Sequence, residues 1–347
     1  MSSERATVKI TEKERAFDLW EGAMDTARRA LAVGFGVALL QALMLIAFAW
    51  PAANIAPRDL PLAATGPHSE AVSAMLAERS PGVFEITTMA DEPAARAAIA
   101  DREVYGAIVT GGGPPRVLVA SGASPAVAQQ LTELERQLSS APAGRVEDVV
   151  PGDPDDPRGI AFGAMALPLV MSGIAAGVLV ALVIPTVSGR ALGLLVFGVL
   201  GGLLSMAIIQ GWLSVVPGSY LVLSSVAGLV SVTVAGSVVG FGALFGRLGI
   251  GLAALTMLLL GNPLSAATSA PELLPQPWGE IGQLLPPGAA ASLLRSVAFF
   301  DGAAAAGPLI VLSSWCVVAL ALLGIGALRS RQTGTAAAPA PSQLPVG

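Results

Sequence analysis

The feature that most constrains this chain is a long stretch, between Asp156 and Glu272, that is almost free of charge. It contains no acidic residue and no lysine, and its only charged residues are Arg158, Arg190 and Arg247. Such a stretch cannot present a surface to water, because soluble domains carry about 25% charged residues. The whole chain is 54% hydrophobic and 12% charged. We therefore expect an integral membrane protein.

Six segments are apolar and long enough to cross the hydrocarbon core of a bilayer, which takes about 20 residues of helix. They are Leu31–Trp50, Ile160–Ile184, Ala191–Val216, Tyr220–Phe245, Leu248–Ala267 and Pro308–Leu328. We predict a mainly α fold: a polytopic six-helix transmembrane bundle with a small α/β extracytoplasmic domain inserted between the first two spans. Residues 30–50 then hold the first span, 160–268 the second to fifth, and 308–328 the sixth.

Arginines in the short loops predict the orientation, since such loops stay on the cytoplasmic side. They lie on one side of a six-span arrangement, at Arg28 and Arg29, at Arg190, at Arg247, and at Arg329 and Arg331. We predict a multi-pass protein of the cell (plasma) membrane with both termini cytoplasmic. The first span is expected to be an uncleaved signal anchor, because its apolar core is longer than that of a signal peptide.

Residues 1–29 are predicted to be cytoplasmic and to form an amphipathic helix from Thr11 to Arg29, with one apolar stripe at helical spacing. The helix either lies flat at the headgroup boundary or docks a cytoplasmic partner, and the two interpretations are compatible. The candidate docking or interfacial residues are Phe17, Trp20, Met24, Arg190 and Arg247.

Residues 51–159 contain the capping, turn and strand signals of a soluble α/β domain with element order αβαββα. The expected helices are Ser69–Arg79, Asp91–Asp101 with Asp91 as its cap, and Ser124–Leu138. The expected strands are Val83–Thr88, Val104–Val109 and Arg116–Ser121, the last two joined by a glycine-rich hairpin-like turn at 111–115. The flanks, 51–67 and 141–157, are predicted to be Pro-rich linkers. The only cysteine, Cys316, lies in an apolar run, so this domain has no internal disulfide.

A second external element is expected at 269–307, where prolines interrupt a segment too apolar for a free loop. We predict an interfacial or partly re-entrant segment on the outer mouth of the bundle, with a short helix at 289–300. Its candidate residues are Trp278, Pro286, Pro287 and Arg295. The tail, 329–347, is rich in Ala, Pro and Thr and is predicted to be disordered.

Catalytic and cofactor chemistry is sparse. No lysine follows Lys13, so the chain has no P-loop for a nucleotide, and the single histidine, His68, rules out His-rich metal sites. Asp153, Asp155 and Asp156 are better explained as a solvated linker than as a calcium site. We expect no enzyme activity, no metal, no cofactor and no nucleic-acid partner.

The spans contain no Asp, Glu or Lys, which proton- and sodium-driven transporters usually bury as the coupling group. A transporter built from this chain must therefore take its energy from a partner. The polar residues that remain, as pathway-lining candidates or interhelical hydrogen-bonding groups, are Gln41, Gln210 and Asn262. Close helix packing, and with it a dimer, is indicated by Gly198, Gly201, Gly202, Gly228, Gly236, Gly240 and Gly242.

One span, an external domain and then five spans is the layout of ABC-2-type permeases, in particular the YhgE/Pip (phage infection protein) branch. The external-domain signature of that branch is similar to Asp91–Ile99 followed by Asp101–Ala107. Leu285–Ala289, with Leu294-Arg295 and Phe299-Phe300 before the last span, also resembles it. The resemblance covers roughly residues 30–328, and its motifs are structural.

The resemblance implies a permease subunit that moves a hydrophobic or envelope-related substrate outward. Its partners would be membrane lipid, a separate ATPase subunit and a second subunit in a homo- or heterodimer. The loops at 186–190 and around Arg247 are too short for a coupling helix, which leaves Thr11–Arg29 as the docking candidate. The alternative is a non-transporting envelope receptor or scaffold that acts through its extracytoplasmic domain.

Overall fold

The computed structural model describes residues 2–111, 113–138 and 146–336, and side chains for residues 20, 23–111, 113–137 and 146–329. The chain divides into two compact units, Met1–Trp50 and Pro51–Gly347. The first unit is the greater part of one continuous helix, α1 (Ser2–Ala53), whose apolar portion Ala23–Ala53 is long enough to span a membrane.

The structure corrects the predicted boundary inside this helix. α1 begins at Ser2 rather than at Thr11, and it has no break between the predicted amphipathic helix and the predicted first span. The two are one element. A helix lying flat on the membrane before a span would need a bend near residue 30, and α1 has none there.

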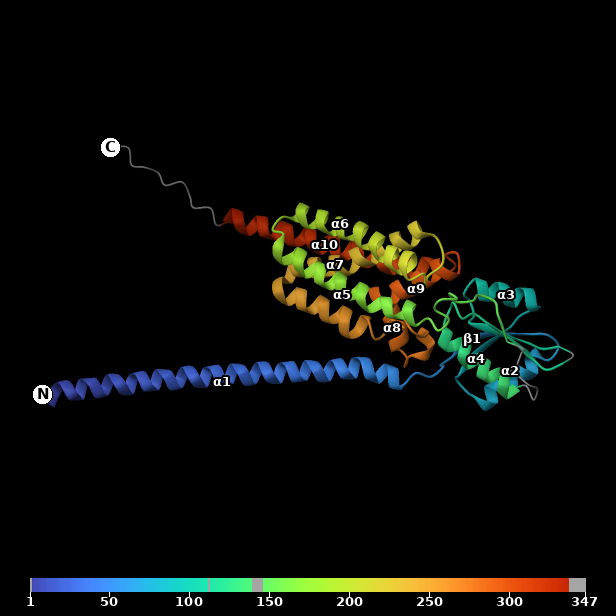
Figure 1. Ribbon diagram of the computed structural model, residues 1–347, viewed down its shortest axis with the longest axis horizontal. Coiled ribbons are helices and arrows are strands. Elements are labelled where there is room, and N and C mark those ends of the chain that lie inside the picture. Colours follow the sequence, from blue (N-terminus) through green and yellow to red (C-terminus); the bar gives the residue numbers. More distant parts are fainter. Residues whose placement is uncertain (1, 112, 139–145, 337–347) are drawn as a thin grey trace, which may run out of the picture. The chain divides into compact units, whose positions relative to one another are not determined.

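The second unit begins with an α/β domain around a five-stranded sheet in the order β2-β1-β3-β4-β5. The strands are β1 (Leu60–Thr65), β2 (Phe84–Thr88), β3 (Gly106–Val109), β4 (Arg116–Val119) and β5 (Val146–Asp148). The β3–β4 pair is antiparallel and the other pairs are parallel. Helices α2 (Ser69–Arg79) and α4 (Pro125–Leu138) cover one face, and α3 (Glu92–Ala100) covers the other (Figure 1).

Most predicted elements of this domain are confirmed, including the hairpin and the cap of α3, where the Ala94 amide donates to Asp91 Oδ1 at 2.8 Å. Two strands were missed because they lie in the predicted linkers. β1 is the second strand of the sheet although it contains Pro61, which cannot donate a ladder hydrogen bond and argues against an interior strand. β5 has only three residues, which is too short for an alternating pattern.

A carboxylate–guanidinium network ties α3 to the far edge of the sheet. Arg96 Nη2 lies 2.8 Å from Glu92 Oε1 and 2.6 Å from Glu147 Oε2, and Arg116 also contacts Glu92. The hydrogen bonds from Arg96 lower the pKa of Glu92 and the pKa of Glu147 below their usual 4.5. The network therefore favours the ionised carboxylates in the folded domain.

This network predicts an acid-sensitive contribution to stability. A carboxyl group with a lowered folded-state pKa stabilises the fold above its unfolded pKa, and this contribution is lost as pH falls through the folded value. We expect Arg96→Ala to lower the thermal midpoint at about pH 7 and to change it little at about pH 2.5, in unfolding followed by fluorescence. An equal loss at both pH values would contradict the electrostatic role.

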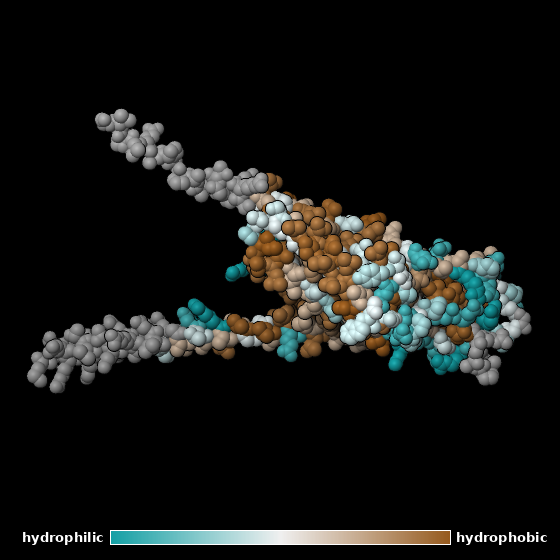
Figure 2. Space-filling model, turned by 45° about the horizontal axis from the view of Figure 1, so that its top comes forward, coloured by the Kyte–Doolittle hydropathy of each residue, from teal (hydrophilic) through white to brown (hydrophobic). Residues whose placement is uncertain are grey.

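The rest of the second unit is a helical bundle. Its long helices are α5 (Ile160–Val183), α6 (Val187–Met206), α7 (Tyr220–Leu255) and α10 (Ala306–Ala336), and the π-helices η1 (Ala207–Trp212) and η2 (Thr256–Gly261) extend α6 and α7. α7 lies at the centre, packed against α5, α6 and α10, and its residues 223–240 are mostly buried. Apolar side chains cover the bundle surface, whereas hydrophilic residues gather on the α/β domain (Figure 2).

Five helices of the described residues are long and apolar enough to cross a membrane, rather than the six predicted. The fourth, Tyr220–Gly261, contains a non-helical Gly246 with φ 63° and ψ −143°. A Cβ added to Gly249 would lie 2.0 Å from the Phe241 carbonyl oxygen, although residues eight apart in a continuous helix are about 12 Å apart. The chain therefore reverses at Gly246.

The predicted fourth and fifth spans are thus two arms of one helical hairpin. The second arm ends at Gly261 rather than at Ala267. It is therefore shorter than a membrane span, which requires about 20 residues. Two other boundaries also move. The helical segment after α5 ends at Trp212 instead of Val216, and α10 stays helical to Ala336, inside the tail predicted to be disordered. Residues 337–347 of that tail lie outside the described residues.

Candidate functional site at the junction of sheet and bundle

The segment between the hairpin and α10 joins the two parts of the second unit. It forms η3 (Pro271–Leu273), α8 (Trp278–Gln283) and α9 (Pro286–Phe299). Ala270, Leu273 and Phe300 belong to the hydrophobic cores of the sheet domain, while Leu294 and Ala298 belong to a core of the bundle. Sheet and bundle therefore share their cores through this segment. It was predicted to lie on the outer mouth of the bundle, but it contributes buried residues to both parts.

Two arginines enter the junction from opposite sides. Arg295 of α9 is 5% exposed, and its Nη2 donates to the Ala267 carbonyl oxygen at 2.9 Å. Its guanidinium lies over the Phe162 ring, 5.0 Å from the centroid, and forms no ion pair within the described part of the chain. Loss of hydration on burial, with nearby Arg102, lowers the pKa of Arg295 to about 10. The charge is retained at neutral pH without a carboxylate partner.

Arg102 reaches the junction from the loop after α3. Its Nη1 donates to the Ser292 carbonyl oxygen at 3.0 Å, and its guanidinium lies 5.2 Å from the centroid of the Phe300 ring. Burial lowers the pKa of Arg102. Its backbone is left-handed, with φ 63°, which costs a non-glycine residue about 1–2 kcal/mol. The surrounding contacts hold this strained residue in place.

A tyrosine–carboxylate pair completes the junction. The Tyr105 hydroxyl donates to Glu272 Oε2 at 2.8 Å, and burial together with the Glu272 charge raises the pKa of Tyr105. The Glu272 carbonyl oxygen also accepts from the Arg58 amide at 3.0 Å. We call Arg102, Tyr105, Glu272 and Arg295 the junction residues. Arg102 and Tyr105 tie the sheet domain to the segment 270–299 by these hydrogen bonds.

The junction predicts a stability effect for Tyr105→Phe. The substitution leaves the half-buried Glu272 carboxylate without its hydroxyl donor, and hydrogen bonds to charged groups contribute about 1.5–3 kcal/mol. We expect a lower free energy of unfolding in denaturant titrations of the purified protein. Tyr220→Phe is the matched control, since that hydroxyl donates to the neutral Leu203 carbonyl oxygen. A larger loss for the control would contradict the prediction.

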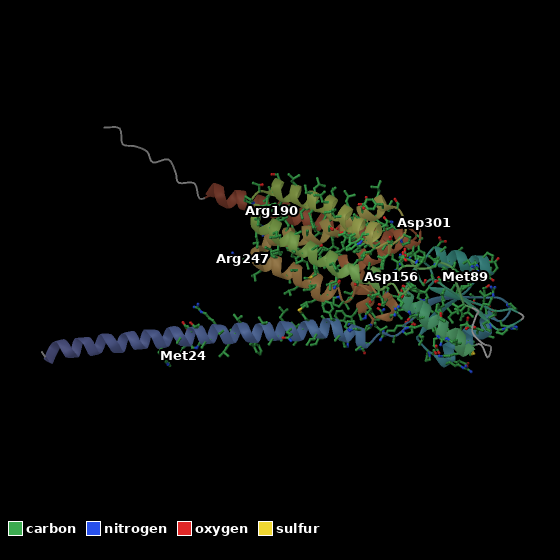
Figure 3. The ribbon with its side chains drawn as sticks, in the orientation of Figure 1. Met24, Met89, Asp156, Arg190, Arg247 and Asp301 are labelled. Atoms are coloured by element: carbon green, nitrogen blue, oxygen red, sulfur yellow. The ribbon has the colours of Figure 1, made fainter. Side chains whose placement is uncertain are left out.

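Two apolar clefts open on the sides of the bundle. One, of about 400 Å³, lies between α6 and α7 and is lined by residues such as Leu195, Gly198 and Val232. The other, of about 450 Å³, lies between α5 and the α6–η1 helix. A third, narrow cavity lies at the junction and is lined by Arg295, Asp156 and Phe162 among others. Figure 3 shows Asp156 where the bundle meets the sheet domain.

The predicted pathway residues lie on three different elements. Gln41 lies in α1, in the other unit. Gln210 lies in η1 and donates to the Gly218 carbonyl oxygen at 2.8 Å, and Asn262 follows the end of η2. None of the three lines the cavities described above. The Gln210 hydrogen bond reaches the loop before α7 rather than another helix, so it is not the interhelical bond considered from the sequence.

The predicted docking residues have varied positions. Trp20 and Met24 lie in α1 and are 60% and 39% exposed, while the side chain of Phe17 lies outside the described residues. Arg190 donates to the carbonyl oxygens of Ala181 and Ile184 at the end of α5. Arg190 and the exposed Arg247 lie at the end of the bundle away from the sheet domain (Figure 3).

Of the outer-mouth residues, Arg295 lies in the junction itself. Pro286 and Pro287 are buried and begin α9, where the missing amide donor of proline costs nothing. Trp278 begins α8 and is 40% exposed. Arg102, Tyr105 and Glu272 were not singled out as site residues, although the first two lie in the motif 101–107. Only the fold brings them to α9.

No group of three or more histidine, cysteine, aspartate or glutamate side chains is placed to hold a metal ion in the described part of the chain. In the predicted linker, Asp156 Oδ2 accepts from the Phe162 amide at 2.8 Å, and Asp153 Oδ1 accepts from the Asp155 amide at 2.9 Å. Asp156 thus contributes to the start of α5, and Asp153 to the turn before it.

Comparison of the chain with known proteins identifies no relative. No known protein family, characterised protein or solved structure matches the chain at a significant level.

Proposed function

We propose that the chain is the membrane permease subunit of an ABC-2-like exporter that moves a hydrophobic or envelope-related substrate outward with energy from a separate ATPase. The observation that carries this proposal is the pair of apolar clefts on the sides of a filled bundle. An apolar substrate can enter such clefts from the bilayer. The resemblance of residues 30–328 to the YhgE/Pip branch supports the same function.

The proposed topology places the sheet domain outside the cytoplasm. Its support is the position of Arg190 and Arg247 at the end of the bundle opposite the sheet domain, since loop arginines favour the cytoplasmic side (Figure 3). The two arms of the α7–η2 hairpin would then be the fourth and fifth membrane segments, the second arm being short. Both termini would be cytoplasmic, and a dimer would complete the transporter.

The proposal is tested by purifying the tagged protein from its native membrane and reconstituting the complex. We expect a P-loop ATPase to accompany it, because the chain itself has none, and its hydrolysis rate to rise with substrate. Deletion of Met1–Asp25 should weaken this association, since α1 offers the longest cytoplasmic segment in the proposed topology. If no ATPase accompanies the protein and the deletion leaves activity intact, the permease function is excluded.

A receptor or scaffold in the envelope is the second candidate. It is favoured by the filled interior of the bundle, where the first arm of α7 is mostly buried and its buried Ser231 and Ser237 hydroxyls donate to carbonyl oxygens of the same helix. It is also favoured by the shared cores of sheet and bundle, which suit a domain held rigidly at the membrane surface. Capture of an envelope partner by the sheet domain, without any ATPase, would support this function instead.

A further inference from the structure

The cleft between α5 and the α6–η1 helix has the character of an acyl-chain site. Its walls are almost wholly apolar, with Met165 and Pro168 on α5 and Ile208 and Ile209 on η1. η1 is a π-helix, a form that is rare and frequent at functional sites. Its volume of about 450 Å³ is within the range of small-molecule sites.

A polar cavity adjoins the junction end of this cleft. The two share Val215 in their walls, and the consecutive residues Ala161 and Phe162 line the cleft and the cavity respectively. The cavity holds about 10 Å³, which is room for roughly one water-sized group. One oxygen atom of a headgroup fits there, and the rest of the headgroup would remain at its mouth.

The charges around this cavity are mixed. Arg295 is buried, donates one hydrogen bond to protein among the described residues, and has further N–H groups to offer. Asp156 is 9% exposed and Asp153 is half-buried, and each accepts one backbone hydrogen bond. One guanidinium and two carboxylates complement a ligand that carries an anionic and a cationic group together.

We propose that the cleft and the cavity bind one glycerophospholipid with a phosphoethanolamine headgroup. A phosphate oxygen accepts from the Arg295 guanidinium, the ammonium group donates to Asp156 and Asp153, and an acyl chain fills the cleft. A purely anionic headgroup meets the two carboxylates unfavourably, and a choline headgroup has no N–H to donate. The inference rests on the proposed function and deepens it, since it names the substrate class.

The first test is lipid binding to the purified full-length protein, measured by native mass spectrometry in a lipid titration. The probes are phosphatidylethanolamine, phosphatidylglycerol and phosphatidylcholine with identical acyl chains. We expect one phosphatidylethanolamine per chain, bound about tenfold more tightly than the other two. Equal binding of the three lipids, or tighter binding of phosphatidylglycerol, would overturn the headgroup assignment.

Substitutions locate the site. Ala164 is exposed in the cleft wall, so Ala164→Trp fills the cleft without entering a core, whereas Leu167→Trp changes an exposed position of the same helix outside the cleft. We expect about a tenfold loss of lipid binding for the first and none for the second. Equal binding by these two variants would place the lipid elsewhere and overturn the proposal.

Arg295→Gln tests the headgroup contact, because glutamine still has an amide donor for the Ala267 carbonyl oxygen but carries no charge. We expect the preference for phosphatidylethanolamine to disappear while the thermal midpoint stays near wild type. If this variant unfolds, the Ala164→Trp and Leu167→Trp pair still decides. Lipid binding is measured without an ATPase, so the two proposals can fail separately. If the protein binds the lipid but no ATPase accompanies it, ATP-driven export is excluded and the lipid site stands.

Discussion

Leu273→Ala is expected to destabilise the sheet domain by about 2–5 kcal/mol, the range for leucine truncation in a packed core. Leu273 lies between the α7–η2 hairpin and α10 in the sequence, yet it is 0% exposed in a core with Leu60, Leu62 and Val117. Its truncation leaves a cavity against β1. The expected loss is large because the surrounding strands cannot close over it.

Hydrogen exchange measures this effect by region. We expect amides of β1 and β4 to exchange roughly 30-fold faster or more, since each 1.4 kcal/mol is a factor of ten. The control is Leu284→Ala in the same segment, where the side chain is 63% exposed and its loss should be nearly silent. If Leu273→Ala leaves exchange in the sheet unchanged, the core is not shared between the sheet domain and this segment.

Gly202→Ala is expected to disrupt the contact between α6 and α7. A Cβ at this position would lie 2.2 Å from the Ser224 carbonyl oxygen and 2.8 Å from the Gly228 amide nitrogen, which are backbone atoms that cannot rotate away. The helices must separate, and overpacking of this kind costs about 1–3 kcal/mol or more. We expect the thermal midpoint of the purified protein to fall by roughly 5 °C or more.

The neighbouring glycine supplies a matched control. A Cβ at Gly201 would meet Phe197 and Ser231 side-chain atoms at 3.6 Å, which is ordinary contact. Alanine is also favoured over glycine inside a helix by about 0.5–1 kcal/mol. Gly201→Ala should therefore leave the thermal midpoint unchanged or raise it. If the thermal midpoint falls equally in both variants, Gly202 is not required for the close approach of α6 and α7.

Local patterns predicted the helices and strands whose residues pack against their own neighbours. α2, α3 and α4 were predicted from caps, prolines and helical spacing, and the β3–β4 hairpin from its glycine turn. β1 was missed because Pro61 and the surrounding prolines indicate a linker, and the strand is held by pairing on both sides with β2 and β3. Such pairing joins residues that are distant in sequence, and no local pattern records it.

In the candidate site, too, individual residues could be selected from the sequence, but the contacts between them could not. Arg295 was singled out from the sequence, but its contacts depend on Phe162 and Ala267, which reach α9 from two other parts of the chain. Gln41, Gln210 and Asn262 were selected because polar residues in apolar spans are rare. Gln210 and Asn262 line none of the described cavities, since the position of a side chain follows from helix packing and not from its polarity.

By itself the sequence determined the class of this protein, since a stretch with three charges between Asp156 and Glu272 leaves lipid as its only suitable solvent. It also determined most local elements of the sheet domain through caps and turns. Only the tertiary structure decided that α7 reverses at Gly246, that sheet and bundle share cores, and that Arg295 is buried with no ion pair among the described residues. These features depend on contacts between segments that are distant in sequence. The free energy of such contacts depends on both segments, so it cannot be inferred from the local sequence of either one.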